Sequence, residues 1–187
     1  MEKINIETEV RIKSFKVAHH LSEETLAFTG KLYIGKVYVA ELCSRGHGGG
    51  VDYYEVEKTN SKNDVLSELS ALVKQFSSSS EIGGRVITLD VSLDWFLAEL
   101  AGQLDDLAYQ KSQMRGRTFV RLKGKDYAEG CWNVFKIPYN NGTAIDRLEA
   151  QNKVVTECLN EQLAKKTFTI SDILKAMGVE DQSLALS

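Results

Sequence analysis

Four of the five residues at positions 46–50 are glycine, in the run Gly46-His47-Gly48-Gly49-Gly50. Glycine has no side chain to bury and loses more backbone entropy on folding than any other residue, so packing does not explain this run. A left-handed backbone or a close approach of the main chain does explain it. The run lacks the spacing of the dinucleotide-binding and P-loop motifs. We therefore expect a loop between two strands, with the rest of the chain organised around it.

The segments on both sides of this loop alternate apolar and polar residues, with the period of two that is typical of strands. Residues 4–17 predict one long strand, or two strands joined by a bulge. Residues 26–34 and 37–42 predict a hairpin, because glycine at the first of the two loop positions Gly35-Lys36 is what a type II′ turn requires. Residues 51–57 resume the strand pattern after the glycine run.

Helical spacing of apolar residues appears in three further segments. It predicts a helix over about 61–76, a long one that starts at Asp90 or Ser92 and is ended by Gly116, and another that starts at Thr143 and reaches Leu163. A short helix is expected at 171–177, ended by Gly178. The residues between these helices include two more strand-like segments, 117–123 and its expected partner 131–137. These elements predict an α+β fold with a mainly antiparallel sheet, an N-terminal β-hairpin and two or three amphipathic helices packed on the sheet.

The length of 187 residues is that of one domain, and we expect residues 1–187 to form a single one. The segment 77–84, with four serines followed by Glu81-Ile82-Gly83-Gly84, is the only low-complexity stretch and predicts a flexible surface loop. Residues from about 179 onward are expected to be frayed.

Composition narrows the classes of function. With 23 Lys and Arg against 26 Asp and Glu, the net charge is -3, so nucleic acid is not expected as a partner. No run of about 18 apolar residues and no signal-like start are present, which predicts a cytoplasmic protein without membrane contact. Cys43, Cys131 and Cys158 form no C-x-x-C pair and are expected to be reduced. The three histidines lack metal-ligand spacing, so we expect no metal site, and nothing in the sequence implies a cofactor.

The glycine run is the first candidate site. Successive exposed amides can bind an anion, and Arg45 and His47 beside Gly46, Gly48 and Gly49 could add charge or a hydrogen bond to a phosphate. The alternative is a purely structural turn that needs positive φ.

The second candidate site lies on the strand expected at 117–123. Arg117, Phe119 and Arg121 share one face of that strand, and guanidinium groups beside an aromatic ring suit a phosphate together with a stacked base. The alternative is a solvated edge strand, where charges block aggregation.

Two groups of residues resemble a known set of proteins. Ser22-Glu23-Glu24-Thr25-Leu26-Ala27-Phe28, the Gly35-Lys36 hairpin and Gly46-His47-Gly48-Gly49 are similar to small, functionally uncharacterised proteins of bacteriophages and other mobile elements. The segments 119–124, 129–132 and 136–139 resemble their C-terminal half. The resemblance implies a phage accessory protein in the host bacterial cytoplasm, and it transfers no mechanism.

Together these observations lead us to expect a phage-encoded, non-enzymatic binding protein that counters bacterial anti-phage defence by sequestering a nucleotide-derived signalling molecule. Its ligand would be small and phosphate-containing, and its pocket could form between subunits of a homo-oligomer. One alternative is an inhibitor that docks on a host or phage protein. Another is a phosphodiester-cleaving enzyme that uses His47.

Overall fold

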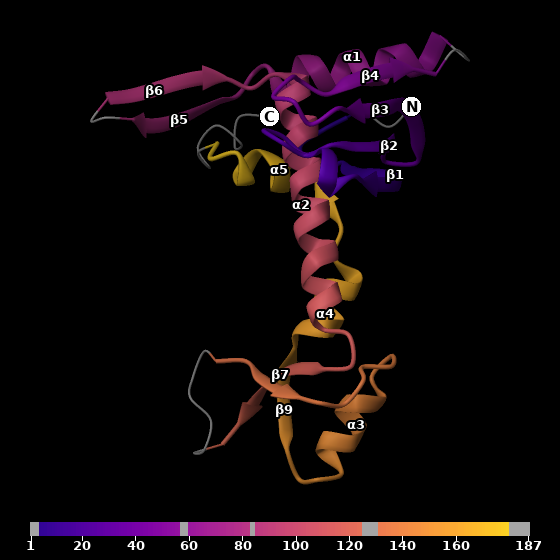
Figure 1. Cartoon of the computed structure of the whole chain (residues 1–187), viewed down its shortest axis with the longest axis vertical. Helices are drawn as coiled ribbons and strands as arrows, with labels where there is room; N and C mark the ends of the chain where they lie inside the picture. Colours follow the sequence, from indigo (N-terminus) through magenta and orange to yellow (C-terminus); the bar gives the residue numbers. More distant parts are fainter. Residues whose placement is uncertain (1–3, 57–59, 83–84, 125–130, 180–187) are drawn as a thin grey trace. The chain divides into compact units, whose positions relative to one another are not determined.

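The computed structural model describes residues 4–56, 60–82, 85–124 and 131–179. These residues form five α-helices and ten strands, in the mixed α+β fold that the sequence predicts (Figure 1). Backbone contacts divide the chain into two compact units, residues 1–104 with 167–187 and residues 105–166. The length of the chain predicts one domain, and no linker-like composition marks this division.

The first unit contains a five-stranded antiparallel sheet with strand order β10-β1-β2-β3-β4. Its strands are β1 (Glu9–Val17), β2 (Phe28–Ile34), β3 (Val37–Ser44), β4 (Asp52–Glu55) and β10 (Phe168–Thr169). The N-terminal hairpin is confirmed: Gly35, with φ of +56°, joins β2 to β3. The first strand starts at Glu9 and not at residue 4. Its bulge is confirmed, because the register shifts between Lys13 and Lys16 and Ser14 has φ of +52°.

Three helices complete the first unit: α1 (Asn60–Val73), the first part of α2 (Leu93–Gln113) and α5 (Ile170–Ala176). A short 3-10 turn, η1 (His19–Leu21), follows β1. The apolar spacing that predicts these helices places their large side chains in the core, where Leu69, Val73, Phe96, Leu97 and Leu100 are fully buried. Burial of these faces, more than helix propensity, stabilises the helices.

The prediction of a flexible loop at 77–84 is wrong for residues 77–82. They form β5 (Ser77–Ile82), which pairs with β6 (Arg85–Asp90) in a two-stranded antiparallel sheet, while Gly83 and Gly84 lie outside the described residues. Ser78 is buried, and its hydroxyl donates to the Met177 carbonyl oxygen at 2.5 Å. The serine run, whose composition is typical of a solvated loop, therefore contributes one buried side chain to the first unit.

Val179, where the frayed tail is expected to begin, is ordered against α5. Val179 is buried, and its amide donates to the Leu174 carbonyl oxygen at 3.1 Å, after Gly178 with φ of +77° has ended α5. Residues 180–187 lie outside the described residues.

The second unit contains a three-stranded antiparallel sheet with strand order β8-β7-β9. Its strands are β7 (Thr118–Lys123), β8 (Asn133–Phe135) and β9 (Val154–Cys158), and its helices are α3 (Thr143–Glu149) and α4 (Leu159–Lys165) together with the end of α2. Val120, Leu148 and Cys158 form a buried apolar cluster in this unit, and Leu107, Ala144 and Leu163 are also buried. The long helix predicted from Thr143 to Leu163 is therefore wrong, because β9 interrupts it.

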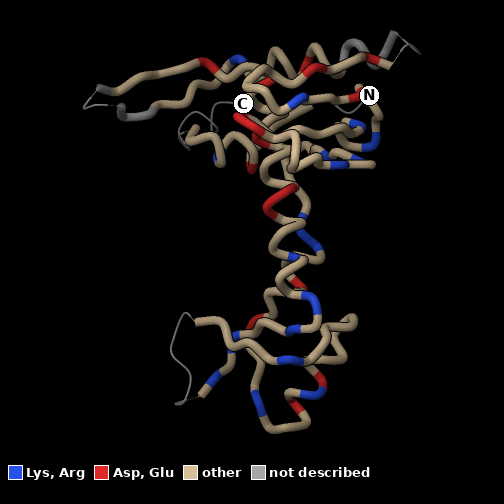
Figure 2. Tube along the Cα trace, in the orientation of Figure 1, with Lys and Arg blue, Asp and Glu red and all other residues tan. Residues whose placement is uncertain are grey.

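Charge is divided unevenly between the units. The second unit holds 11 Lys and Arg against 8 Asp and Glu, a net of +3, and the first unit holds 12 against 18, a net of -6. Figure 2 shows the blue basic positions recurring along the second unit. Within the described part of the chain, no helix combines the length and the apolar character needed to cross a bilayer.

Candidate functional site

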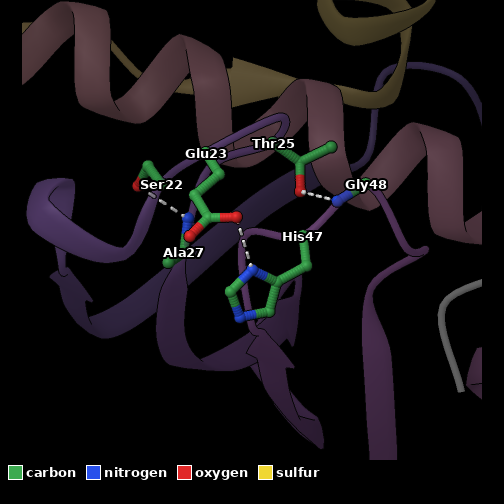
Figure 3. Close-up of polar contacts among 6 residues, drawn as sticks. All are labelled: Ser22, Glu23, Thr25, Ala27, His47 and Gly48. Carbon is green, nitrogen blue, oxygen red and sulfur yellow. Dashed lines mark hydrogen bonds and ion pairs between the residues drawn. The ribbon is translucent and has the colours of Figure 1, made fainter.

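The glycine run and the Ser22–Thr25 segment form one clasp. The carbonyl oxygen of Gly46 accepts hydrogen bonds from the amides of Glu23 and Glu24, both at 3.0 Å, and of Thr25 at 3.3 Å. Residues 22–25 and the glycine run, which are distant in sequence, are thus in direct contact (Figure 3). The Ser22 hydroxyl oxygen accepts from the Ala27 amide at 2.9 Å and anchors the clasp to the start of β2.

Gly46 and Gly48 are required by the geometry of this clasp. Both have positive φ, +84° and +80°. A Cβ on Gly46 would collide with the Leu21 carbonyl oxygen and with Ala27, and one on Gly48 would collide with the Glu24 carboxylate. A Cβ on Gly49 would meet no atom within 4 Å, and the φ of Gly49 is not positive. A purely structural role in the turn therefore accounts for two of the glycines in the run.

His47 extends the clasp with a side-chain contact to Glu23. Its Nδ1 lies 3.2 Å from Oε2 of Glu23, with the two side chains 60% and 70% exposed. The Gly48 amide donates to the Thr25 hydroxyl oxygen at 3.4 Å. A carboxylate beside an imidazole is the arrangement that orients a general base, but at this exposure water screens the pair strongly.

An open pocket of about 470 Å³ lies beside the clasp, lined by Arg45, Gly46, His47, Gly49, Gly50 and Asp52. Four of the five predicted loop residues therefore gather at one concavity. Among the described residues, none accepts a hydrogen bond from the amides of Gly49 and Gly50. The carboxylate of Asp94 approaches Gly50, however, and Asp52 lines the pocket itself. Two carboxylates beside one guanidinium make this pocket a poor receptor for a phosphate.

The predicted residues of the second unit share one strand face, as the alternation indicates. Thr118 and Val120 of β7 are buried, whereas Phe119 and Arg121 are half-buried on the opposite side and Arg117 is exposed. We call this side the outer face of β7. Arg121 pairs in register with Glu157 of β9, and its Nη1 lies 2.7 Å from Oε2 of that carboxylate.

Trp132 lies on the other side of Arg121, just before β8. The guanidinium carbon of Arg121 is 4.6 Å from the centre of the Trp132 ring, a cation–π contact. A row of indole, guanidinium and carboxylate thus runs across the sheet. The Nε of Arg121 is buried and, within the described residues, has no hydrogen-bond partner.

Asn160 holds the start of β7 in place. Its Oδ1 accepts from the Phe119 amide at 2.8 Å, and its Nδ2 donates to the Arg117 carbonyl oxygen at 2.9 Å. The buried side chain thereby replaces a neighbouring strand at this point and fixes the backbone from which Arg117 and Phe119 project.

The two candidate sites expected from the sequence belong to different units. Arg45, Gly46, His47, Gly48 and Gly49 lie in the first, and Arg117, Phe119 and Arg121 lie in the second. Each unit therefore carries one candidate surface.

Sequence reasoning missed the partners of these residues. Glu23, Asp94, Glu157 and Asn160 are distant in sequence from the groups that they contact, and no local spacing marks them. From the sequence, Trp132 is recognisable only as an aromatic residue near a strand. Its position in the segment 131–137, which is expected to pair with 117–123, could have indicated a contact with Arg121. In the described part of the chain, no three His, Cys, Asp or Glu side chains converge as metal ligands.

Comparison of the chain with family models, curated proteins and solved structures finds no match.

Proposed function

We propose that this chain is a non-enzymatic binding protein that holds a nucleotide-derived ligand on the outer face of β7. The observation that carries the proposal is the Arg121 guanidinium over the Trp132 ring at 4.6 Å, on the strand face shared with Phe119. The resemblance to phage and mobile-element proteins supplies the setting, in which the protein counters a bacterial defence system by sequestering a nucleotide signal.

The chemistry of this face suits both parts of a nucleotide. A base can stack on Phe119 or on the guanidinium plane that Trp132 supports, and each stacked base contributes about 1–3 kcal/mol. Residues two apart on a strand are about 6.8 Å from each other. If the base stacks on Arg121, Lys123 is two residues away and can bind a phosphate close to the base. Arg117 is four residues away and can bind a second, more distant phosphate. Among the described residues, no carboxylate forms an ion pair with Arg117 or Lys123.

Isothermal titration with a panel of cyclic and ADP-ribose-type nucleotides tests the proposal. We expect one or more of these nucleotides to bind, and Arg117→Gln to weaken binding about tenfold or more, because it removes a charged hydrogen bond. Arg117 is exposed, so the substitution should leave the fold intact.

The matched control is Arg45→Gln, which removes the same charge from the glycine-loop pocket and should leave the affinity unchanged. Loss of binding in Arg45→Gln, with Arg117→Gln unaffected, would place the ligand at the glycine loop instead. No binding by the whole panel would end the proposal. Chromatography of the recovered nucleotide checks the non-enzymatic part, since a cleaved product would indicate a phosphodiesterase acting through His47 and Glu23.

A second candidate function is an inhibitor that docks on a host or phage protein. The β5–β6 hairpin favours it, because Val86, Ile87 and Leu89 are 73%, 41% and 57% exposed. Pull-down from bacterial lysate should then recover a stoichiometric protein with the wild-type chain and not with Val86→Lys/Leu89→Lys. Recovery that is unchanged by these substitutions would exclude docking through the hairpin.

A further inference from the structure

The carboxylate of Glu157 faces the surface proposed to hold the base. Glu157 stands directly opposite Arg121 in the β7–β9 ladder, so both side chains lie on the outer face of the sheet. Its Oε2 is held by Arg121 at 2.7 Å, and its side chain remains 42% exposed. Among the described residues, none donates a hydrogen bond to Oε1.

The Glu157 carboxylate disfavours binding of a phosphate beside it and favours binding of a hydrogen-bond donor. A carboxylate accepts hydrogen bonds and donates none, and it repels an anion at close range. The phosphates must therefore lie toward Lys123 or Arg117, while the edge of the ligand that meets Glu157 must carry N–H groups. The ion pair with Arg121 fixes the carboxylate, so its free oxygen is preorganised for such a donor.

The nucleobases differ in what they present to a fixed carboxylate. Guanine offers two adjacent donors, N1–H and the N2 amino group, which a carboxylate can accept together. Hypoxanthine lacks the amino group. Adenine has an amino donor, but the neighbouring N1 is an acceptor whose lone pair the carboxylate repels.

We infer that the outer face of β7 selects guanine nucleotides, with Glu157 accepting from the N1–H and N2 amino edge while the base stacks on the Arg121 guanidinium above Trp132. The inference rests on the proposed function and names the class of ligand that this surface takes. Glu157 is its specificity-determining residue.

Fluorescence titration gives a direct test, because Trp132 is one of only two tryptophans. In the Trp95→Phe background, the remaining indole reports on stacking at this face. GMP, IMP and AMP are the probes. We expect GMP to bind about tenfold or more tightly than IMP and AMP, since one charged hydrogen bond is lost with either.

Glu157→Gln should abolish the preference for GMP over IMP, whereas Glu161→Gln should retain it. Glu161 is the matched control because it lies in the same unit and its carboxylate is paired with Lys165. Equal affinities for the three nucleotides in the unsubstituted protein, or a preference that survives Glu157→Gln, would overturn the inference and leave the proposed function standing. Absence of binding by all three would overturn the inference, and the cyclic and ADP-ribose panel then decides the proposed function independently. The affinities for GMP and IMP can be compared in the unsubstituted protein, so the inference remains testable even if Glu157→Gln does not fold.

Discussion

Gly46 shows how one residue can fix a local structure. Its carbonyl oxygen collects three amides, and its backbone has φ of +84° in a position where a Cβ would meet Leu21 and Ala27. We predict that Gly46→Ala lowers the free energy of unfolding by about 2–4 kcal/mol, because a left-handed alanine is strained and the main chain around it must move. Urea denaturation measures the change.

Gly49→Ala is the control for this substitution. A Cβ there meets nothing within 4 Å, and the backbone is not left-handed, so the change in stability should stay within about 0.5 kcal/mol. Equal stability of the two variants would contradict the conclusion that the geometry of the clasp requires glycine at position 46.

Tyr38 provides a prediction about pH. Burial, and then the hydrogen bond that its hydroxyl donates to Glu41 at 3.0 Å, raise the pKa of Tyr38 from 10.0 to about 12. The neutral form is therefore favoured in the folded chain. The resulting stabilisation is complete below pH 10 and is lost as the pH rises toward 12.

The measurement is the urea midpoint between pH 10 and 12, compared between the wild-type chain and Tyr38→Phe. The wild-type chain should lose stability more steeply in this range, because its unfolded state releases a proton that its folded state keeps. Parallel curves would show that Tyr38 does not titrate differently in the two states.

At the scale of the element, the buried Asn160 side chain holds the start of β7 through two hydrogen bonds to its backbone. Asn160→Ala would leave the Phe119 amide and the Arg117 carbonyl without their partner, at a cost of about 2–4 kcal/mol for two unsatisfied groups. We expect urea denaturation to show this loss, together with faster amide exchange at Phe119. Gln162→Ala, an exposed change on the same helix, should alter stability by no more than about 0.5 kcal/mol. Similar losses in both variants would contradict the role given to Asn160.

Elements with a strong local signal could be predicted from the sequence. The Gly35-Lys36 turn and the apolar stripe of α2 agree with their tertiary environment, so propensity and packing point to the same structure. The strand at residues 154–158 could not be predicted from the sequence, because the helical spacing of apolar residues continues across it, at Leu148, Val155, Leu159 and Leu163. The β-branched run at 154–156 is the opposing signal.

The candidate site was predictable only in part, for a related reason. Alternation along one strand correctly places Phe119 and Arg121 on one face. Contacts such as those of Glu157 and Asn160 depend on strand pairing and on a buried side chain reaching another element, which no single stretch of sequence specifies. The same limit applies to Glu23, whose contact with His47 joins two motifs.

At the scale of the whole molecule, the two tryptophans lie in different units, Trp95 in the first and Trp132 in the second. We predict that single-tryptophan chains, Trp132→Phe and Trp95→Phe, report two distinct urea transitions. The second unit should unfold first, because among the described residues it buries far fewer apolar side chains than the first unit. Fluorescence at increasing urea is the measurement, and coincident curves would show that the units unfold together.

The first unit is built from two stretches of chain that flank the second. During synthesis on a ribosome, β10 and α5 emerge only after every residue of the second unit has been translated. Until then the outer edge of β1 at Glu9 and Val10 has no partner strand. A nascent chain can therefore complete the second unit first, and the five-stranded sheet of the first unit is closed only afterwards, by β10.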